Sequence, residues 1–146
     1  MPPSRPLTVD ELAELFEGHT RFVEKLAEHP DPLASAQAVI AELTQDEKLE
    51  ALDAHPAIGA KTLSARSAAE QGGDDDPATL AELERLNAEY EQRFGFRFVV
   101  FVNRRPKSEI VPILRERLGR TREQELDTAV QELVAIAEDR WRRSWR

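Results

Sequence analysis

Helix-start signals recur along this chain of 146 residues, and they constrain its fold more than any other feature. Residues 8–11, 44–47 and 121–124 each begin with threonine and carry glutamate or glutamine three positions later, which is the capping box of a helix N-terminus. Apolar residues follow each box at spacings of three and four, as in an amphipathic helix. The pattern predicts an all-α chain of six to eight helices, folded as a single domain over residues 1–146 with residues 1–7 flexible.

Proline, serine and glycine mark further helix boundaries. Asp31-Pro32 and Asp76-Pro77 each combine a capping aspartate with a proline that suits the first helical position. Gly95 is the expected stop of the helix that begins at Asp76-Pro77, and Ser108 is the expected cap of a helix that ends at Gly119. A weaker helical pattern covers residues 63–71, where the composition is rich in good helix formers. These signals complete the predicted set of helices.

 Residues 96–102 form the only strand-like run of the sequence, because six of its seven residues are apolar, namely three phenylalanines and three valines. An isolated strand would leave the hydrogen-bonding groups of its edge unpaired, and no second run is present to pair with it. We therefore interpret residues 96–102 as a buried extended segment or as part of a helix.

The composition excludes several classes of protein. The net charge of −8 argues against a nucleic-acid-binding surface, and no apolar stretch approaches the ~20 residues of a membrane span. There is no cysteine, which excludes disulfides, thiolate nucleophiles and cysteine-ligated metals. The N-terminus lacks the apolar region of a signal peptide. We therefore expect a cytoplasmic protein with neither nucleic-acid nor membrane partners.

The C-terminal run, residues 140–146, is basic and contains two tryptophans. A run of this kind can contact a polyanion. More often it is the solvated last turn of a helix, where cations interact favourably with the helix dipole. We adopt this second interpretation for most of the run.

Three histidines are candidates for acid–base chemistry, and only His55 has an unusual setting. His19 and His29 are placed at helix ends, where a surface or capping role is the simplest interpretation. No two histidines have metal-ligand spacing. His55 follows core-facing residues and precedes Pro56, which restricts the backbone, so it is well placed for proton transfer. The residues alone favour the simpler alternative, a histidine bonded to the last carbonyls of its helix.

Ser67, Glu70 and Gln71 form a second group of polar residues. In a helix their spacing places them on one face, where a hydroxyl, a carboxylate and an amide could bind a small polar ligand. The alternative is an ordinary solvated helix face, and the residues alone favour it.

Five motifs, in order from about Phe16 to Arg140, resemble those of the OHCU decarboxylases, in which OHCU is 2-oxo-4-hydroxy-4-carboxy-5-ureidoimidazoline. The first two, HPAIG and SAAEQ, begin at His55 and Ser67 and are similar to the family's H-P-x-(I/L)-(G/A) and S-x-x-E-Q motifs. The third comprises residues 86–90 and 94–99 and resembles L-N-x-x-Y followed by F-G-F-P-F-V. The last two, RERL and IAEDR, fit the two C-terminal helices of the family.

The resemblance implies an all-helical lyase that converts OHCU to (S)-allantoin in urate degradation, without a metal or other cofactor, and it implies a homodimer. It makes His55 the catalytic histidine and Glu70 the carboxylate that works with it. Arg140 corresponds to a substrate-binding arginine, and residues 98–102 line the site largely through their backbone. The residues matched to substrate contacts are Pro56, Ser67, Gln71, Phe98, Val99, Val100, Phe101, Val102 and Arg140.

A non-catalytic binding module with the same helical fold is the alternative function. Arg97 stands where the family usually has proline, Ala69 stands where it has arginine, and the family's N-terminal R-P-F element has its nearest counterpart in residues 29–31. Arg97 and the missing element favour the binding module. The joint presence of the matched histidine, glutamate, glutamine and arginine favours the enzyme.

Overall fold

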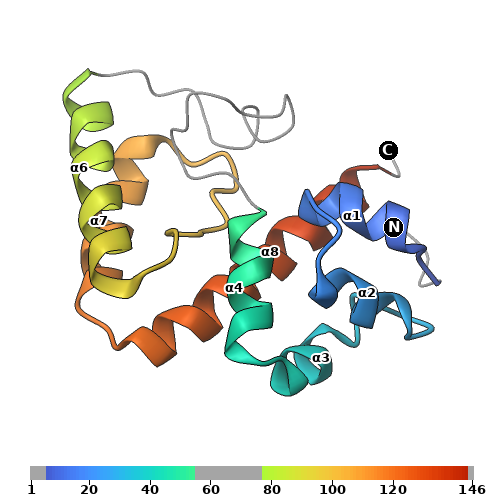
Figure 1. Ribbon diagram of the computed structural model, residues 1–146. Helices are drawn as coiled ribbons and strands as arrows, with labels where there is room; N and C mark the ends of the chain where they lie inside the picture. The colour runs from blue at the N-terminus through green and yellow to red at the C-terminus, as the bar shows by residue number, and fades with distance from the viewer. Residues whose placement is uncertain (1–5, 55–76, 145–146) are drawn as a thin grey trace. The chain divides into compact units, whose positions relative to one another are not determined.

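The computed structural model describes residues 6–54 and 77–144, and these residues form seven helices and no strand (Figure 1). The predicted all-α fold class is therefore confirmed. The chain divides into two compact units, of which unit 1 comprises residues 1–55 and 126–146 and unit 2 comprises residues 56–125. Among the described residues, no helix combines the length and the apolar composition that crossing a membrane requires.

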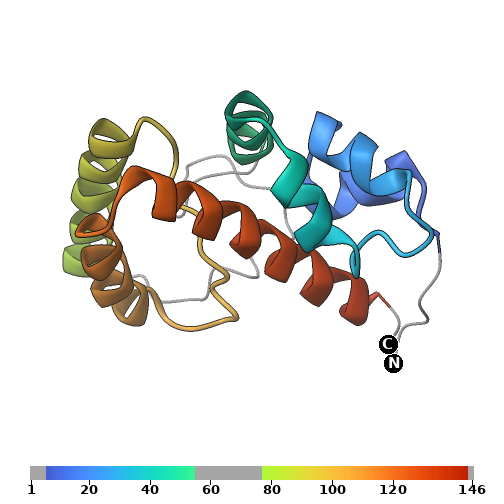
Figure 2. The same ribbon diagram turned by 90° about the horizontal axis from the view of Figure 1, so that it is seen from below.

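Unit 1 contains four short helices and most of a long one. Helix α2 packs against α1, α3 and α4, and its apolar residues Phe22, Val23 and Leu26 are completely buried. Figure 2 shows the turns of α8 that belong to this unit, in orange and red, beside the blue-to-teal helices. The helices are α1 (Val9–Phe16), α2 (Arg21–Ala27), α3 (Ala36–Glu42), α4 (Gln45–Asp53) and α8 (Arg122–Arg143).

The three predicted capping boxes are present. Thr8 and Thr44 each accept a hydrogen bond from the third residue of the following helix, whose glutamate accepts one in return. Thr121 and Gln124 make the same reciprocal pair at the start of α8, at 3.1 and 3.2 Å. Each cap satisfies backbone N–H groups that have no partner within the helix, and a cap of this kind contributes about 1 kcal/mol.

The helix predicted to begin at Asp31-Pro32 begins instead at Ala36. The N–H of Ser35 donates to the carbonyl of Asp31 at 3.0 Å, which forms one helical turn. The N–H of Ala36 then donates to the carbonyl of Leu33, three residues back rather than four. This change of hydrogen-bond pattern separates the turn from α3, so the aspartate–proline signal marks a turn and not the helix itself.

A close backbone approach joins α4 to the turn between α1 and α2. A Cβ atom added to Gly18 would lie 2.8 Å from the Cβ of Ala54, which is closer than carbon atoms normally approach. Phe16 and Phe22 meet edge to face across the same turn, with ring centroids 5.3 Å apart. Lys48 pairs with Asp127 at 2.8 Å and so connects α4 to α8. Glycine at position 18 therefore allows α1, α2 and α4 to form one core.

Unit 2 is built on two helices that pack together, α6 (Pro77–Phe94) and α7 (Lys107–Leu118). Gly95 ends α6 in the left-handed conformation, at φ 81°, as its predicted role as a stop requires. The two helices are also connected at their surface, where Arg115 of α7 and Arg85 of α6 both bind Glu82, at 2.6 and 2.8 Å.

The prediction that Ser108 caps α7 is wrong. Pro106 is the N-cap, and Ser108 is an exposed residue already within the helix. The helical hydrogen bonds begin before Ser108, because the N–H of Glu109 donates to the carbonyl of Pro106 at 2.9 Å. Pro106 has a restricted φ and adopts the extended conformation that an N-cap needs, so it can begin the helix without a side-chain hydrogen bond.

Candidate functional site

Residues 96–102 form an extended segment between α6 and α7 that belongs neither to a helix nor to a ladder of strands. Phe98, Val99, Val100 and Val102 are buried, and Phe101 is half-buried. The first of the two sequence interpretations, a buried extended segment, is therefore confirmed. Among described residues this is a long stretch of buried backbone without secondary structure, so its hydrogen-bonding groups need other partners.

Two arginine side chains supply partners for the carbonyl groups of this segment. Arg117 of α7 donates from Nη1 to the carbonyl of Val99 at 2.6 Å. Arg105 donates from Nη2 to the carbonyl of Phe101 at 2.7 Å and from Nε to that of Val102 at 3.0 Å. These charge-assisted hydrogen bonds hold the peptide groups of the segment in defined orientations.

The N–H groups at the middle of the segment, unlike its carbonyl groups, have no such partners among the described residues. Within the described part of the chain, the N–H groups of Val99 and Val100 form no hydrogen bond. Both residues are almost completely buried, with exposed fractions of 2% and 5%. Buried backbone donors nearly always have a partner in folded proteins. A polar ligand with carbonyl or carboxylate oxygens could supply it.

Arg140 of α8 is buried in unit 1, with an exposed fraction of 2%. Its Nη1 donates to the carbonyl of Leu15 at 2.8 Å, and its Nη2 lies 3.7 Å from a carboxylate oxygen of Glu17. Leu15 is in the last turn of α1 and Glu17 is its C-cap, so the guanidinium binds the negative end of that helix. The solvated-tail interpretation therefore does not hold for Arg140, whereas Arg142 is exposed as expected.

A buried polar cluster lies in unit 2 and was missed by the sequence analysis. We call it the Glu125 cluster, because this carboxylate, which is completely buried, accepts from three side chains. Arg117 Nε binds it at 2.7 Å, Tyr90 Oη at 2.5 Å and Arg120 Nη1 at 3.0 Å. The one signal available from the sequence was the periodicity, which places Arg117 and Glu125 next to apolar positions of their helices.

Burial, assisted by the hydrogen bond to Glu125, raises the pKa of the Tyr90 hydroxyl above its usual range. The hydroxyl therefore stays protonated at neutral pH and acts as a donor to the carboxylate. Phe94, Phe96 and Phe98 surround the Tyr90 ring with centroids 4.6 to 5.9 Å away, so the cluster sits in an aromatic environment.

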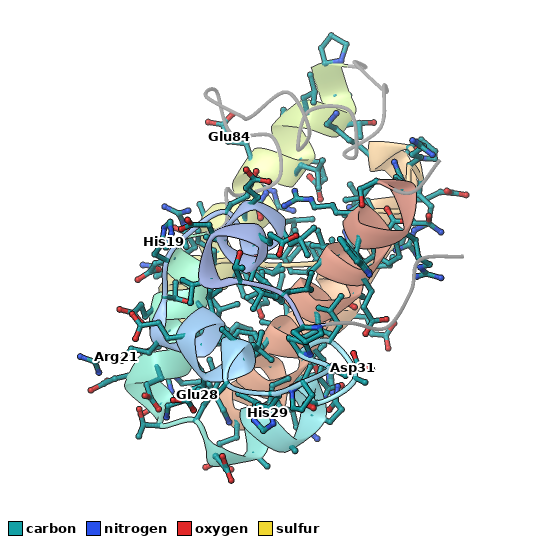
Figure 3. The ribbon with its side chains drawn as sticks, turned by 90° about the vertical axis from the view of Figure 1, so that its right-hand side faces the viewer. His19, Arg21, Glu28, His29, Asp31 and Glu84 are labelled. Atoms are coloured by element: carbon teal, nitrogen blue, oxygen red, sulfur yellow. The ribbon has the colours of Figure 1, made fainter. Side chains whose placement is uncertain are left out.

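His19 and His29 have the peripheral positions expected of them, and Figure 3 labels both side chains on unit 1. His19 is exposed, with Nε2 3.0 Å from a carboxylate oxygen of Asp10, and His29 is half-buried just after α2. Among the residues described, no group of three or more histidine and carboxylate side chains is placed to hold a metal ion.

The other residues of the predicted site lie outside the described residues. They are His55, Pro56, Ser67, Glu70 and Gln71. Their roles in catalysis and substrate binding therefore stay predictions. The described part of the predicted site consists of Arg140 in unit 1 and residues 98–102 in unit 2.

Comparison with known proteins assigns the family. Residues 4–142 match the sequence model of the family described as OHCU decarboxylase. The 2-oxo-4-hydroxy-4-carboxy-5-ureidoimidazoline decarboxylase of Haloferax volcanii is 30% identical over 142 residues, which cover 89% of this chain and 84% of that protein. A protein of the same name from Amia calva is 39% identical over 82 residues, which cover 55% of this chain and 47% of that protein.

The fold is also similar to a solved structure, described as the crystal structure of OHCU decarboxylase in the presence of (S)-allantoin. The TM-score is 0.75 and the identity 23%, over 90% of this chain and 94% of the other. At this identity the likeness shows the fold alone. The assignment to a family rests on the sequence matches, which extend over nearly the whole chain. The chain belongs to the OHCU decarboxylase family, the carboxy-lyases that act in urate degradation.

Proposed function

We propose that this chain converts 2-oxo-4-hydroxy-4-carboxy-5-ureidoimidazoline to (S)-allantoin without a metal or an organic cofactor. The observation that carries the proposal is the family match over residues 4–142, together with a relative of that name aligned over 84% of its length. The buried extended segment supports it independently, because the segment offers backbone donors for a small ligand rich in oxygen acceptors.

The substrate itself supplies the electron sink for this reaction. The bond between the ring carbon and the carboxylate breaks, carbon dioxide leaves, and the electron pair passes into the adjacent ring C=N group. A proton must then be added from one face to the neighbouring ring carbon, which carries the ureido group, and this sets the configuration of the product. The hydroxyl on the carbon that lost carbon dioxide gives up its proton and becomes the ring carbonyl. The protein has to orient the carboxylate, stabilise the developing charge and deliver that proton.

His55 is the proposed proton donor, and Glu70 the proposed carboxylate that orients the imidazole and favours its protonated form. A positioned proton donor of this kind typically contributes ~10²–10⁴-fold to the rate. Pro56, Ser67 and Gln71 are the proposed substrate contacts beside them. The match of both motifs, HPAIG and SAAEQ, to those of the family supports these roles.

Residues 98–102 are proposed to bind the substrate through their backbone. The carbonyls of Val99, Phe101 and Val102 already accept from arginine side chains. The N–H of Val100 points away from the carbonyl of Val99 and is therefore the group left to meet the carbonyl or ureido oxygens of the substrate. The burial of Val100 would strengthen such a hydrogen bond, because water does not compete for it.

Arg140 is proposed to bind the substrate carboxylate or ureido oxygens. A guanidinium group suits planar oxygen pairs because its donors are arranged in a fixed fork. The hydrogen bond from Nη1 to the carbonyl of Leu15 supports the proposal, because it restricts the orientation of the group before any ligand arrives. The nearby carboxylate of Glu17 keeps the buried charge partly compensated.

The chirality of the product tests the function. The chain would be added to urate, urate oxidase and the hydrolase that precedes this step, and the circular dichroism of the allantoin followed over time. We expect rapid accumulation of (S)-allantoin, whereas the same mixture without the chain gives racemate by spontaneous decay. Racemate at the spontaneous rate in both reactions would contradict the proposal and favour the binding module. Light scattering on the purified chain would test the homodimer.

A further inference from the structure

Arg117 is fixed on two sides by partners within unit 2. Its Nε binds Glu125 at 2.7 Å, and its Nη1 binds the carbonyl of Val99 at 2.6 Å. The guanidinium carbon also lies 4.6 Å from the centroid of the Phe98 ring. Because the guanidinium is planar and rigid, two hydrogen bonds from different nitrogens fix the plane of the whole group. Arg117 therefore connects the helix α7 to the extended segment in one defined geometry.

The Glu125 cluster keeps this arginine in place. Tyr90 and Arg120 donate to the carboxylate of Glu125, so its oxygens have partners besides Arg117. The side chain of Arg117 is only 6% exposed and that of Glu125 is completely buried. Separating the pair would leave the buried charge of Arg117 without its carboxylate, which is strongly unfavourable. The Glu125 cluster therefore holds the Arg117 guanidinium in addition to its hydrogen bond with the segment.

The hydrogen bond to Val99 also determines where the next N–H group points. The carbonyl of Val99 and the N–H of Val100 belong to one planar peptide group, and the bond is trans in this structure. They therefore point in opposite directions, and fixing the carbonyl directs the N–H away from Arg117. A cation bound to the carbonyl also polarises the peptide group, which makes its N–H a better donor.

We propose that Arg117 is a positioning residue that directs and polarises the N–H of Val100 toward the substrate of the decarboxylation. This inference rests on the proposed function, since it supplies the reason why that backbone can stabilise charge in the transition state. Arg105 does the same for the N–H of Val102, because it holds the carbonyl of Phe101 in the preceding peptide group. Both arginines act through the backbone and neither is assigned a contact with the substrate.

The test uses the full chain with Arg117→Lys, and Arg115→Lys as the matched control. Lysine keeps the charge but lacks the fork that reaches two partners from one fixed plane. Arg115 lies on the same helix, is exposed and binds Glu82, so its substitution leaves the segment untouched. In ¹H–¹⁵N spectra, Arg117→Lys should move the Val100 amide resonance and weaken its response to added (S)-allantoin. Arg115→Lys should leave both as in the unsubstituted chain.

In kinetics, Arg117→Lys should lower kcat on the order of 10- to 100-fold with little change in KM, because the misdirected donor acts mainly in the transition state. A merely structural role would lower the melting temperature and leave the kinetics of the folded protein unchanged. A folded variant with normal kcat, or with an unmoved Val100 resonance, would overturn the inference. If the unsubstituted chain does not turn over OHCU, the proposed function fails and the inference fails with it. If the unsubstituted chain turns over OHCU and Arg117→Lys leaves both readouts unchanged, the inference alone fails.

Arg105→Lys keeps the test decisive if Arg117→Lys does not fold, because Arg105 is half-buried and lies in the loop before α7. We expect its effect at the Val102 amide, because the carbonyl of Phe101 in the same peptide group loses its side-chain donor. The loss of kcat should be smaller than for Arg117→Lys, because the N–H of Arg105 still donates to the carbonyl of Val102 and holds the end of the segment. An unmoved Val102 resonance together with an unchanged kcat in this variant would overturn the inference.

Discussion

Arg140 donates a hydrogen bond from Nη1 to the backbone carbonyl of Leu15 at 2.8 Å, although the two residues are 125 positions apart in the sequence. The bond joins the last turns of α8 to the end of α1. Arg140 is buried, whereas Arg142, two residues further along the same helix, is exposed. Arg140 therefore has a structural role within unit 1 as well as its proposed role in substrate binding.

Arg140→Ala should lower both stability and substrate binding. The change removes the donor to Leu15 and leaves the carboxylate of Glu17 without this cation, so we expect a loss of about 2–4 kcal/mol in the free energy of unfolding. KM should rise at least as much as kcat falls. Urea unfolding and steady-state kinetics measure the two effects. Arg142→Ala is the control, and equal stability of the two variants would contradict the structural role.

His55→Asn should remove most of the stereospecific turnover while the helical spectrum is retained. Asparagine has a similar size and keeps a hydrogen-bonding group, but it cannot deliver a proton. The expected loss of kcat is ~10²–10⁴-fold. Circular dichroism at far-ultraviolet wavelengths checks the fold, and the chirality of the allantoin reports the activity. Near-normal turnover by a folded variant would refute the assignment, and His29→Asn should behave like the unsubstituted chain.

Gly18→Ala should destabilise unit 1. The added Cβ would lie 2.8 Å from that of Ala54, so the turn between α1 and α2 has to move away from α4. Overpacking of this kind typically costs about 1–3 kcal/mol. Gly119→Ala is the matched control, because its Cβ would meet its nearest atom at 3.5 Å, an ordinary contact. Thermal unfolding of both variants is the measurement, and a Gly18→Ala variant as stable as the control would show that the turn can adjust freely.

Glu47 should make the stability of unit 1 depend on pH in the acidic range. The backbone N–H of Thr44, followed by the side chain of Lys25, lowers the pKa of this carboxyl below its ordinary value of 4.5. A lowered pKa in the folded state contributes stability above the ordinary pKa, and that stability is lost as the pH falls through the lower, folded value. Glu47→Gln keeps the capping box but cannot titrate.

The unfolding midpoints of the unsubstituted chain and of Glu47→Gln should accordingly converge as the pH is lowered from 5.5 toward 3. The exposed Glu84 on α6 provides the control substitution, Glu84→Gln. A constant difference between the unsubstituted chain and Glu47→Gln over this range would rule out the linkage.

Removal of metal ions should not change the activity. The proposed electron sink is the ring C=N of the substrate, so no Lewis acid is needed to accept the electron pair. Turnover would be measured after prolonged dialysis against a chelator and again after zinc, magnesium or manganese is added back. Activity that disappears on chelation and returns with one metal would contradict the cofactor-independent mechanism.

The sequence determined those features that depend on neighbouring residues. The capping boxes at Thr8, Thr44 and Thr121 were predictable because cap and partner are three positions apart and interact in any context. The stop at Gly95 was predictable for the same reason, since glycine adopts positive φ without strain. The prediction for Ser108 was wrong because two possible helix starts, Pro106 and Ser108, lie two residues apart. The helix begins after the earlier one.

Only the tertiary structure decided which polar groups are buried and what they bind. Arg117 and Glu125 are charged residues of a kind that usually lies on a solvated helix surface. The spacing of apolar residues in the sequence does not predict that they meet beside Tyr90. Arg140 was part of a basic tail in the sequence, and it became a buried contact because α1 lies against α8. The energies of helix caps are local, whereas the burial of a charge depends on which distant segments surround it, and that depends on the fold of each whole unit.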